Sequence, residues 1–281
     1  MRFFIVFISL ILFSGITLFS QKPFFKKDIE WNDYSKKDLS LNSKVEKIKS
    51  IDDGLLFYLK SNSILRQNLS NFHFIDYDLD GEIEILYSGD AGTDAKRTLI
   101  FELNKRGNYV KTFDKFGEVY CIRQFLEVEP FSFILKEEAC CGGITVTYEI
   151  YHPIYEKDSL RLRASSKYCS IKGVKLPKKE IEPIRFKVKN ERYYLRLKPI
   201  INNKNKVHYH LIKGNVIAEY TKGAQGYAIA KETDDSGRIW WFVIMNNKKK
   251  PSKTVINNGS NNNNDFYSFG WMSSRYLKAI E

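Results

Sequence analysis

The chain has 281 residues, of which 43% are hydrophobic and 15% aromatic, so it has ample apolar side chains to fill two cores of ordinary size. Its formal net charge of +12 suits anionic partners such as envelope polymers, lipid head groups or nucleic acid. We interpret the lysines, which are spread along the chain, mainly as a soluble surface. No nucleic-acid-binding motif is present, so we expect no nucleic acid partner.

Residues 1–20 have the pattern of a secretory signal peptide. A basic start is followed by an apolar run over residues 3–19 and by the small residue Ser20. Leu18 stands where a small residue is preferred at a cleavage site, and the run is slightly short for a membrane span. We expect export to the periplasm, the cell surface or the medium. The alternative is an uncleaved N-terminal anchor, which would be the chain's only contact with a membrane.

Residues 21–70 are expected to be a lead-in that contains one short helix. The first part, 21–48, is polar and lysine-rich with little periodicity, and we expect it to be flexible. The run 50–60 has helix character, because Ser50 can cap it and leucines supply an apolar face. Gly54 weakens this prediction.

Residues 71–171 predict a β-rich domain, an antiparallel meander of sandwich-like character. Short runs rich in β-branched and aromatic residues alternate with turns, and helix signals are nearly absent. The expected strands cover 72–75, 82–89, 97–103, 109–113, 118–128, 131–137 and 144–151.

An acidic loop lies between the first two of these runs, in the sequence IDYDLDGEIEI. Alternate carboxylates followed by Gly81 can wrap several oxygen ligands around one hard cation such as calcium. The segment 72–88 resembles a single calcium loop of FG-GAP-type repeats, in which an aspartate-rich loop links two strands. A complete propeller is not expected, because only one such repeat is present. The alternative is a solvated acidic turn. The candidate ligands are Asp76, Asp78, Asp80, Glu82 and Glu84.

All four cysteines fall in the same domain, at positions 121, 140, 141 and 169. An even number in an oxidising compartment favours disulfides. Adjacent Cys140 and Cys141 rarely pair with each other, so Cys121 is expected to pair with one of them and Cys169 with the other, in an order left open. The alternative is that all four are buried thiols.

The proline-containing and charged segment 172–185 predicts a linker, after which β-type runs resume over 186–281. The sequence Asp234 to Gly237 predicts a hairpin turn. The polar, asparagine-rich insert 248–265 is expected to be a mobile hairpin loop.

The region 186–281 resembles bacterial SH3-like (SH3b-type) domains. The resemblance is carried by YYLRLKP at 193–199, the strand runs within 214–245 and, most specifically, GWMSSRYL within 269–280. The insert 248–265 departs from a compact member of that family. The resemblance implies a small β-barrel that binds a cell-wall peptide, a glycan or an envelope protein.

Aromatic side chains are the candidate ligand-binding groups of this barrel. Side chains alternate across a strand, so Trp240 and Trp241 are expected to face opposite sides, one in the core and one free for a groove. Flat rings with a polar edge suit peptides and sugars. For Trp271 and one of the tandem tryptophans the core is the better interpretation. The candidates are Tyr193, Tyr194, Trp240, Trp241, Trp271 and Tyr276.

No catalytic residue is assigned. Cys169 lacks the helix start that usually activates a nucleophilic thiol, and His208 with His210 lacks a third metal ligand nearby. We therefore expect a mainly β, exported, non-catalytic binding or scaffold protein of the bacterial cell envelope, with a possible structural calcium ion as its single cofactor. The alternative is a cell-envelope hydrolase, of the cysteine peptidase or glycosidase type, with an unrecognised active site in 71–171.

Overall fold

The computed structural model describes residues 40–51, 69–90, 95–123, 131–139, 142–156, 159–203, 211–246, 249–256 and 266–280. The expected signal segment and nearly all of the helix expected at 50–60 lie outside these ranges. Within them, no helix is both long and apolar enough to cross a membrane.

The fold is mainly β, which confirms the prediction. The first part contains α1 (Leu41–Lys49), the 3-10 turn η4 (Leu69–Asn71), β1 (Phe72–Ile75), β2 (Glu84–Asp90), β3 (Lys96–Leu103), β4 (Tyr109–Phe116), β5 (Glu118–Arg123), β6 (Ser132–Glu138), β7 (Thr145–Glu156) and β8 (Ser159–Ile171). The second contains β9 (Ile184–Val188), β10 (Arg192–Arg196), β11 (Val216–Thr221), β12 (Gln225–Thr233), β13 (Ile239–Met245), β14 (Lys253–Thr254), β15 (Tyr267–Ser273), the 3-10 turn η5 (Ser274–Tyr276) and β16 (Leu277–Ala279).

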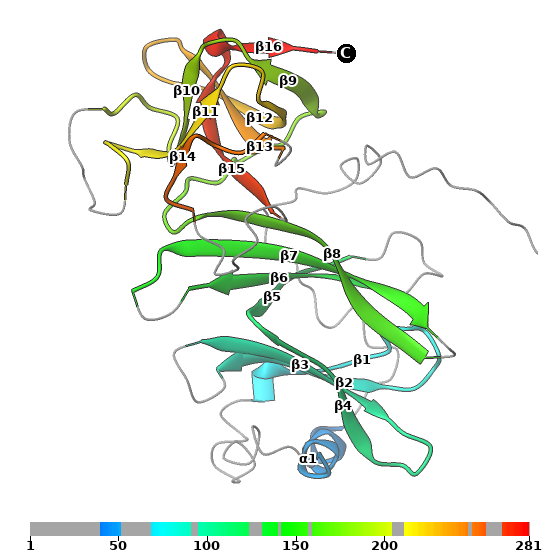
Figure 1. The fold of residues 1–281 in the computed structure, drawn as a ribbon. Helices are drawn as coiled ribbons and strands as arrows, with labels where there is room; N and C mark the ends of the chain where they lie inside the picture. Colours follow the sequence, from blue (N-terminus) through cyan, green and yellow to red (C-terminus); the bar gives the residue numbers. More distant parts are fainter. Residues whose placement is uncertain are drawn as a thin grey trace, which may run out of the picture.

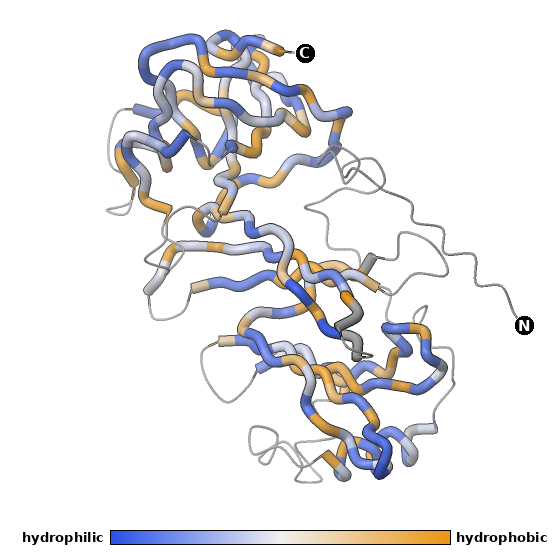
Figure 2. The backbone as a smooth tube through the Cα atoms, turned by 45° about the vertical axis from the view of Figure 1, so that its right-hand side comes forward, coloured by the Kyte–Doolittle hydropathy of each residue, from blue (hydrophilic) through white to orange (hydrophobic). Residues whose placement is uncertain are grey.

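The elements are stacked in layers. Helix α1 lies against the sheet β1-β2-β3-β4, the strands β5 to β8 form the next layer, and β9 to β16 gather at the far end (Figure 1). The expected meander is therefore divided between the four-stranded sheet β1–β4 and the strands β5–β8, which face it and continue through β15 into a sheet of twelve strands. Neighbouring strands are antiparallel within β1–β4 and within β5–β8, which we call the first and the second sheet. Figure 2 shows apolar residues running through the stacked strands and hydrophilic residues at many of the turns.

The first sheet is covered on both faces. Ile85 and Tyr87 of β2 pack in one apolar cluster with Ile48 of α1. Leu86, which lies between them in the sequence, packs in a different cluster against residues of β5 to β8. The side chains of a strand alternate between faces, so an unbroken apolar run is what two buried faces require.

Helix α1 lies in a region that we expected to be flexible, so that prediction was wrong. Val45 and Ile48 recur at helical spacing, and Ile51 follows just beyond the last turn, so one side of the helix packs on the first sheet. The hydroxyl of Ser40 accepts a hydrogen bond from the backbone N–H of Ser43 and caps the helix. The surrounding lysines hid this short apolar pattern.

The second sheet lies between the first sheet and the C-terminal strands. Phe133 and Leu135 of β6 pack against the first sheet. Ile134, on the opposite face, packs in a cluster with Trp240 and Phe242 of β13. The N-terminal and C-terminal parts of the chain thus share an apolar core.

Strand β15 joins the second sheet to the C-terminal strands. It runs antiparallel to β13 and pairs in parallel with β8, where Tyr267 lies opposite Tyr168. The hydroxyl of Ser170 donates to the carbonyl of Phe269, at 2.9 Å. The segment 172–185 lies along this junction, with Val174 packed against the shared core.

The hairpin between β12 and β13 forms where it was expected. The carboxylate of Asp234 accepts hydrogen bonds from the backbone N–H groups of Ser236 and Arg238, and Gly237 adopts a positive φ of 76°. Trp240 and Trp241 face opposite sides, as predicted, because they pack in different apolar clusters. The strands β9 to β16 surround the cluster that Trp241 borders. Their identity as an SH3-like barrel stays a prediction.

Two further differences from expectation concern segments with many polar residues. Part of the insert is ordered, because β14 pairs with β11 and Ile256 is buried in the C-terminal core. Residues 257–265 of the insert lie outside the described residues. Strand β8 was missed because polar residues interrupt it, although Tyr168 and Cys169 are buried.

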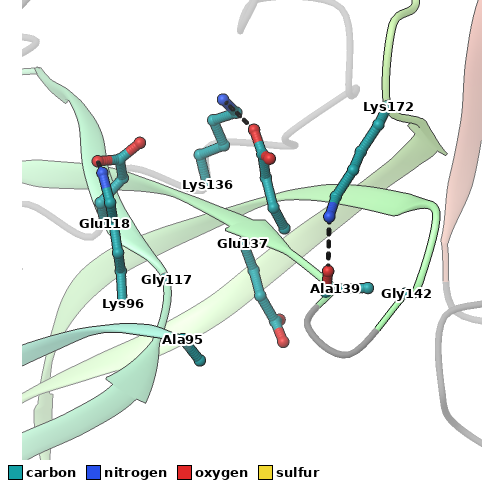
Figure 3. Close-up of a pocket in the computed structure, with 10 residues that line it drawn as sticks. Ala95, Lys96, Gly117, Glu118, Lys136, Glu137, Ala139, Gly142 and Lys172 are labelled. Atoms are coloured by element: carbon teal, nitrogen blue, oxygen red, sulfur yellow. Dashed lines mark hydrogen bonds and ion pairs between the residues drawn. The ribbon is translucent and has the colours of Figure 1, made fainter. Parts of the chain in front are cut away.

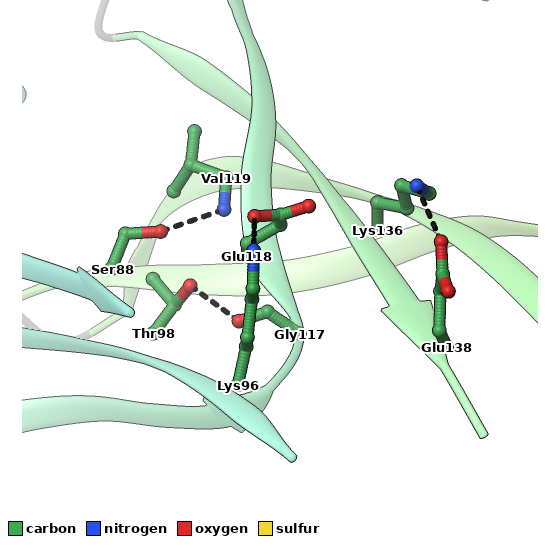
Figure 4. A network of polar contacts seen from close by, with 8 residues as sticks. All are labelled: Ser88, Lys96, Thr98, Gly117, Glu118, Val119, Lys136 and Glu138. Atoms are coloured by element: carbon green, nitrogen blue, oxygen red, sulfur yellow. Dashed lines mark hydrogen bonds and ion pairs between the residues drawn. The ribbon is translucent and has the colours of Figure 1, made fainter. Parts of the chain in front are cut away.

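Gly117 makes the corner at which the chain passes from the first sheet to the second. Its φ is 109°, its N–H donates to the carbonyl of Lys96, and its own carbonyl accepts from the hydroxyl of Thr98 (Figure 4). A Cβ atom at this position would lie 2.9 Å from the carbonyl oxygen of Lys136. The hydroxyl of Ser88 accepts from the backbone N–H of Val119 just beyond the corner.

We predict that Gly117→Ala lowers the free energy of unfolding by about 2–4 kcal/mol, because it combines an unfavourable φ with a backbone clash. Gly107→Ala is the control, since Gly107 also has a positive φ but a Cβ there meets no atom within 4 Å. It should cost only about 1–2 kcal/mol. Urea unfolding of both variants measures the difference. Equal losses would show that the corner is not tightly packed.

Candidate functional site

The acidic loop between β1 and β2 brings three of its five expected ligands together. Asp76, Asp78 and Glu84 each offer a carboxylate oxygen, and these three oxygens lie within 4.8 Å of one another. Asp76 and Glu84 are each only 2% exposed, because Asp76 directly follows β1 and Glu84 begins β2. The strand pairing of Ile75 with Glu84 holds the two ends of the loop together.

Burial makes the ionised forms of this cluster unfavourable. It raises the pKa of the Glu84 carboxyl to about 9, an effect that the hydrogen bond from the backbone N–H of Tyr77 partly opposes and the neighbouring aspartates reinforce. Burial, with the charge of Asp80, raises the pKa of Asp78 to about 6. A cation among these carboxylates would offset both costs.

The other two expected ligands are not members of this cluster, although the backbone N–H of Asp80 donates to the carboxylate of Asp78. Asp80 and Glu82 are exposed, and the carboxylate of Asp80 accepts a hydrogen bond from the backbone N–H of Glu82, at 2.7 Å. Asp80 therefore shapes the turn. Leu79 adopts a positive φ of 64°, which places the loop residues in a tight reversal.

Three of the six candidate aromatic residues are in the core. Trp240 and Trp271 are fully buried, and their indole N–H groups donate to Asp234 Oδ2 and to the carbonyl of Lys175. Tyr193 is 7% exposed and its hydroxyl accepts from the backbone N–H of Ser273. These three side chains are not available for a surface groove. The core interpretation of Trp271 and of one tandem tryptophan is therefore confirmed, and the placing of Tyr193 among the groove candidates was wrong.

The other three candidates remain partly exposed. The rings of Tyr194 and Tyr276 flank that of Tyr193, with centroid distances of 6.4 and 4.6 Å. Lys213 lies over the Tyr194 ring, 4.2 Å from its centroid, and its ammonium donates to the Tyr194 hydroxyl. Trp241 lies apart from this group and packs against Phe186.

Arg196 holds the loop beside this aromatic group. Its guanidinium is buried and donates to the carbonyl of Asn202 and to the side-chain oxygens of Asn203 and Asn215. Burial lowers its pKa from the usual value. The neutral amide partners fix the loop that follows β10.

The cysteines that the structure describes are buried thiols. The Sγ atom of Cys121 donates to the carbonyl of Ile122, and that of Cys169 lies 3.6 Å from the hydroxyl of Thr147. Cys140 and Cys141 lie outside the described residues, so the expected disulfides stay a prediction. Burial raises the pKa of the Cys169 thiol to about 11, which disfavours it as a nucleophile. His208 and His210 also lie outside the described residues.

A pocket of about 390 Å³, which sequence reasoning missed, lies at the corner between the two sheets. Figure 3 shows lysines and glutamates entering it from the start of β3, the Gly117 corner, the end of β6 and the turn after β8. No sequence signal pointed to it, because its residues come from four separate segments. The charged residues that line it are Lys96, Glu118, Lys136, Glu137, Glu138 and Lys172.

Most charged side chains of this pocket are paired with other groups of the same pocket. Lys96 pairs with Glu118 and Lys136 with Glu138, and the ammonium of Lys172 donates to the carbonyl of Ala139. The pairing with Lys136 lowers the pKa of Glu138. Burial raises that of Glu137. These ion pairs are partly exposed, so each contributes little to stability, but they leave little unpaired charge in the pocket to recognise a ligand.

No family model, no curated protein and no solved structure matches this chain.

We predict that iodoacetamide labels Cys169 slowly in the native protein at pH 8, because a thiol with a pKa near 11 is mostly protonated and this one is buried. Peptide mapping by mass spectrometry measures the label at this position. Unfolding without reductant should then expose it to rapid labelling. Labelling that needs a reductant would instead support the expected disulfide, and rapid labelling of the native protein would contradict the burial.

Proposed function

We propose that the chain is an exported, non-catalytic binding protein of the bacterial cell envelope, and that its C-terminal strands engage a cell-wall peptide, a glycan or a protein partner. The observation that supports this is the partly exposed aromatic pair Tyr194 and Tyr276 around the buried Tyr193 ring. Such rings bury area at low entropic cost and keep a polar edge for hydrogen bonds.

The surroundings of Tyr194 favour a ligand with acceptor or anionic groups. The ammonium of Lys213 reaches the Tyr194 hydroxyl at 2.9 Å, so the aromatic surface carries a positive charge at its edge. Tyr193 supports the surface from below through its bond to the backbone of Ser273. A wall peptide offers both carboxylates and backbone carbonyls to such a surface.

The hydrolase alternative has less support. Its cysteine form needs an accessible thiolate, whereas Cys169 is buried and its pKa is raised to about 11. Its glycosidase form needs a pair of carboxylates with separated pKa values across a substrate. In the corner pocket, burial raises the pKa of Glu137 and the pairing with Lys136 lowers that of Glu138, but the two are neighbours on β6. Neighbouring side chains of a strand point to opposite faces, so these carboxylates do not face each other across a substrate. Glu118 is paired with Lys96.

We predict that the purified full chain is retained on peptidoglycan, and that Tyr194→Ala with Tyr276→Ala weakens retention tenfold or more, since a buried interface aromatic contributes about 2 kcal/mol. A pull-down with quantified free protein measures this. Phe116→Ala is the matched control, because Phe116 is also an exposed aromatic but lies on β4.

Unchanged retention by the double variant would exclude the aromatic pair as the binding element. Release of soluble fragments from wall material by the pure protein would support the hydrolase alternative. Cell fractionation that finds the chain in the cytosol would contradict the export on which this function depends.

We further propose that the acidic loop binds one calcium ion, which stiffens the connection between β1 and β2. The support is the convergence of Asp76, Asp78 and Glu84 within 4.8 Å in a loop whose ends are paired strands. Several oxygen ligands from one short loop are what calcium requires, and backbone carbonyls and water complete such sites.

We predict that calcium raises the midpoint of thermal unfolding of protein first treated with a chelator. At a free concentration 100 times the dissociation constant, the gain is about 2.7 kcal/mol. Asp76→Asn with Glu84→Gln should abolish the shift, while Asp80→Asn with Glu82→Gln, which removes the same charge from exposed positions, should preserve it. No shift of the wild-type midpoint at millimolar calcium would refute the proposal.

A further inference from the structure

The positive charge of the chain is concentrated in its C-terminal part. Residues 172–281 contain 22 of the 45 lysines and arginines but only 9 of the 33 aspartates and glutamates. The difference, +13, is close to the net charge of +12 of the whole chain, so the remaining residues are nearly neutral in sum. The cationic residues are therefore spread along the whole sequence, but the net charge differs strongly between residues 1–171 and residues 172–281.

Strand β9 turns cationic side chains outward at alternate positions. Phe186 and Val188 are buried in the C-terminal core, whereas Arg185, Lys187 and Lys189 are exposed. Because strand side chains alternate between faces, the three cations form one row with a spacing of about 6.7 Å. They have no acidic residue between them in the strand.

Strand β16 adds a fourth cation to this row. Lys278 lies directly opposite Lys187 in the antiparallel pairing of β16 with β9, and both are exposed. Like charges at directly opposed positions destabilise a sheet. We call Arg185, Lys187, Lys189 and Lys278 the basic ridge.

The basic ridge lacks carboxylate partners among the residues that the structure describes. Arg185 donates to the side-chain oxygen of Gln225, a neutral acceptor on β12. The nearby Glu191 pairs with Lys222. An anionic partner would therefore offset the repulsion among these four cations.

We infer that the basic ridge binds a linear polyanion of the phosphodiester type. This rests on the proposed binding function and names the chemical class of its partner. An extended chain covers about 3.3–3.6 Å for every three backbone bonds. A polymer with six backbone bonds between successive charges therefore matches the spacing of alternate strand residues. A polymer in which three carbons separate successive phosphodiester groups has this repeat, because P–O–C–C–C–O–P contains six bonds.

The composition of the ridge favours such a polymer over a membrane or a single-stranded nucleic acid. Membrane-binding surfaces combine cations with inserted tryptophan, phenylalanine or leucine. The four ridge positions are all cationic, and their neighbours on β12 are Gln225, opposite Lys187, and Tyr227, opposite Arg185. Tyr227 is partly buried against the shared core, so its ring is not free to insert into a membrane. Single-stranded nucleic acids are held by aromatic side chains that stack on bases. Beside the ridge only Tyr227 is aromatic, and it packs against the core, so the ridge offers mainly charge, which suits a backbone without bases.

The experiment measures binding of the purified full chain to a fluorescent abasic oligodeoxynucleotide, a phosphodiester polymer without bases. Arg185→Gln, Lys187→Gln and Lys278→Gln together should weaken binding by about tenfold or more. The slope of log K against log salt concentration should also become shallower by about 2, since each lost contact to a single strand removes about 0.7 from it. The matched control is Lys179→Gln, Lys231→Gln and Lys253→Gln, three exposed lysines of the same part outside the ridge. It should bind like the wild type.

Other outcomes overturn the inference. Equal loss in the control variant would assign binding to net charge, and tight binding to vesicles of anionic phospholipid without binding to the oligonucleotide would assign the ridge to a membrane. If the wild type does not bind the oligonucleotide but is retained on peptidoglycan, the inference fails and the proposed function stands. If it binds neither, both fail.

Discussion

Both faces of β6 are buried over Ser132–Leu135, and the rest of the structure depends on this constraint. One face packs on the β1–β4 sheet and the other on β13 and β15, so β6 carries Phe133, Ile134 and Leu135 in succession. Apolar burial of about 25 cal/mol per Å² accumulates on both faces and fixes the stacking. The corner at Gly117 and the parallel pairing of β8 with β15 are the connections that this stacking requires.

The candidate sites lie at different places in this stack. The acidic loop lies beside the junction of the first two sheets, where Tyr77 packs on Phe133. The exposed aromatic pair and the basic ridge lie on the C-terminal strands, at the end of the stack far from α1. At the junction of the first two sheets the charged side chains are paired with one another, as Lys96 is with Glu118. Surface chemistry that is available to a partner is thus found away from the shared core.

Sequence reasoning found the strand content because local signals determine it. Runs such as 72–75 and the turn at Asp234 carry their own β-branched residues and turn chemistry. It missed what depends on distant contacts: α1 is a helix because Ile48 packs on a sheet, and the corner pocket combines four separate segments. The opposite orientation of the tandem tryptophans followed from strand geometry, but which of them is fully buried was set by the neighbouring sheet.

The long sequence separation between β8 and β15 bears on how the protein folds during synthesis. Tyr168 and Ser170 find their partners about a hundred residues later, at Tyr267 and Phe269. Contacts between residues so distant in sequence slow folding, because the closure of a long loop comes first. During synthesis the apolar outer face of the second sheet therefore stays uncovered until β15 has left the ribosome. A fragment that stops before β15 would expose this face and would be prone to aggregation.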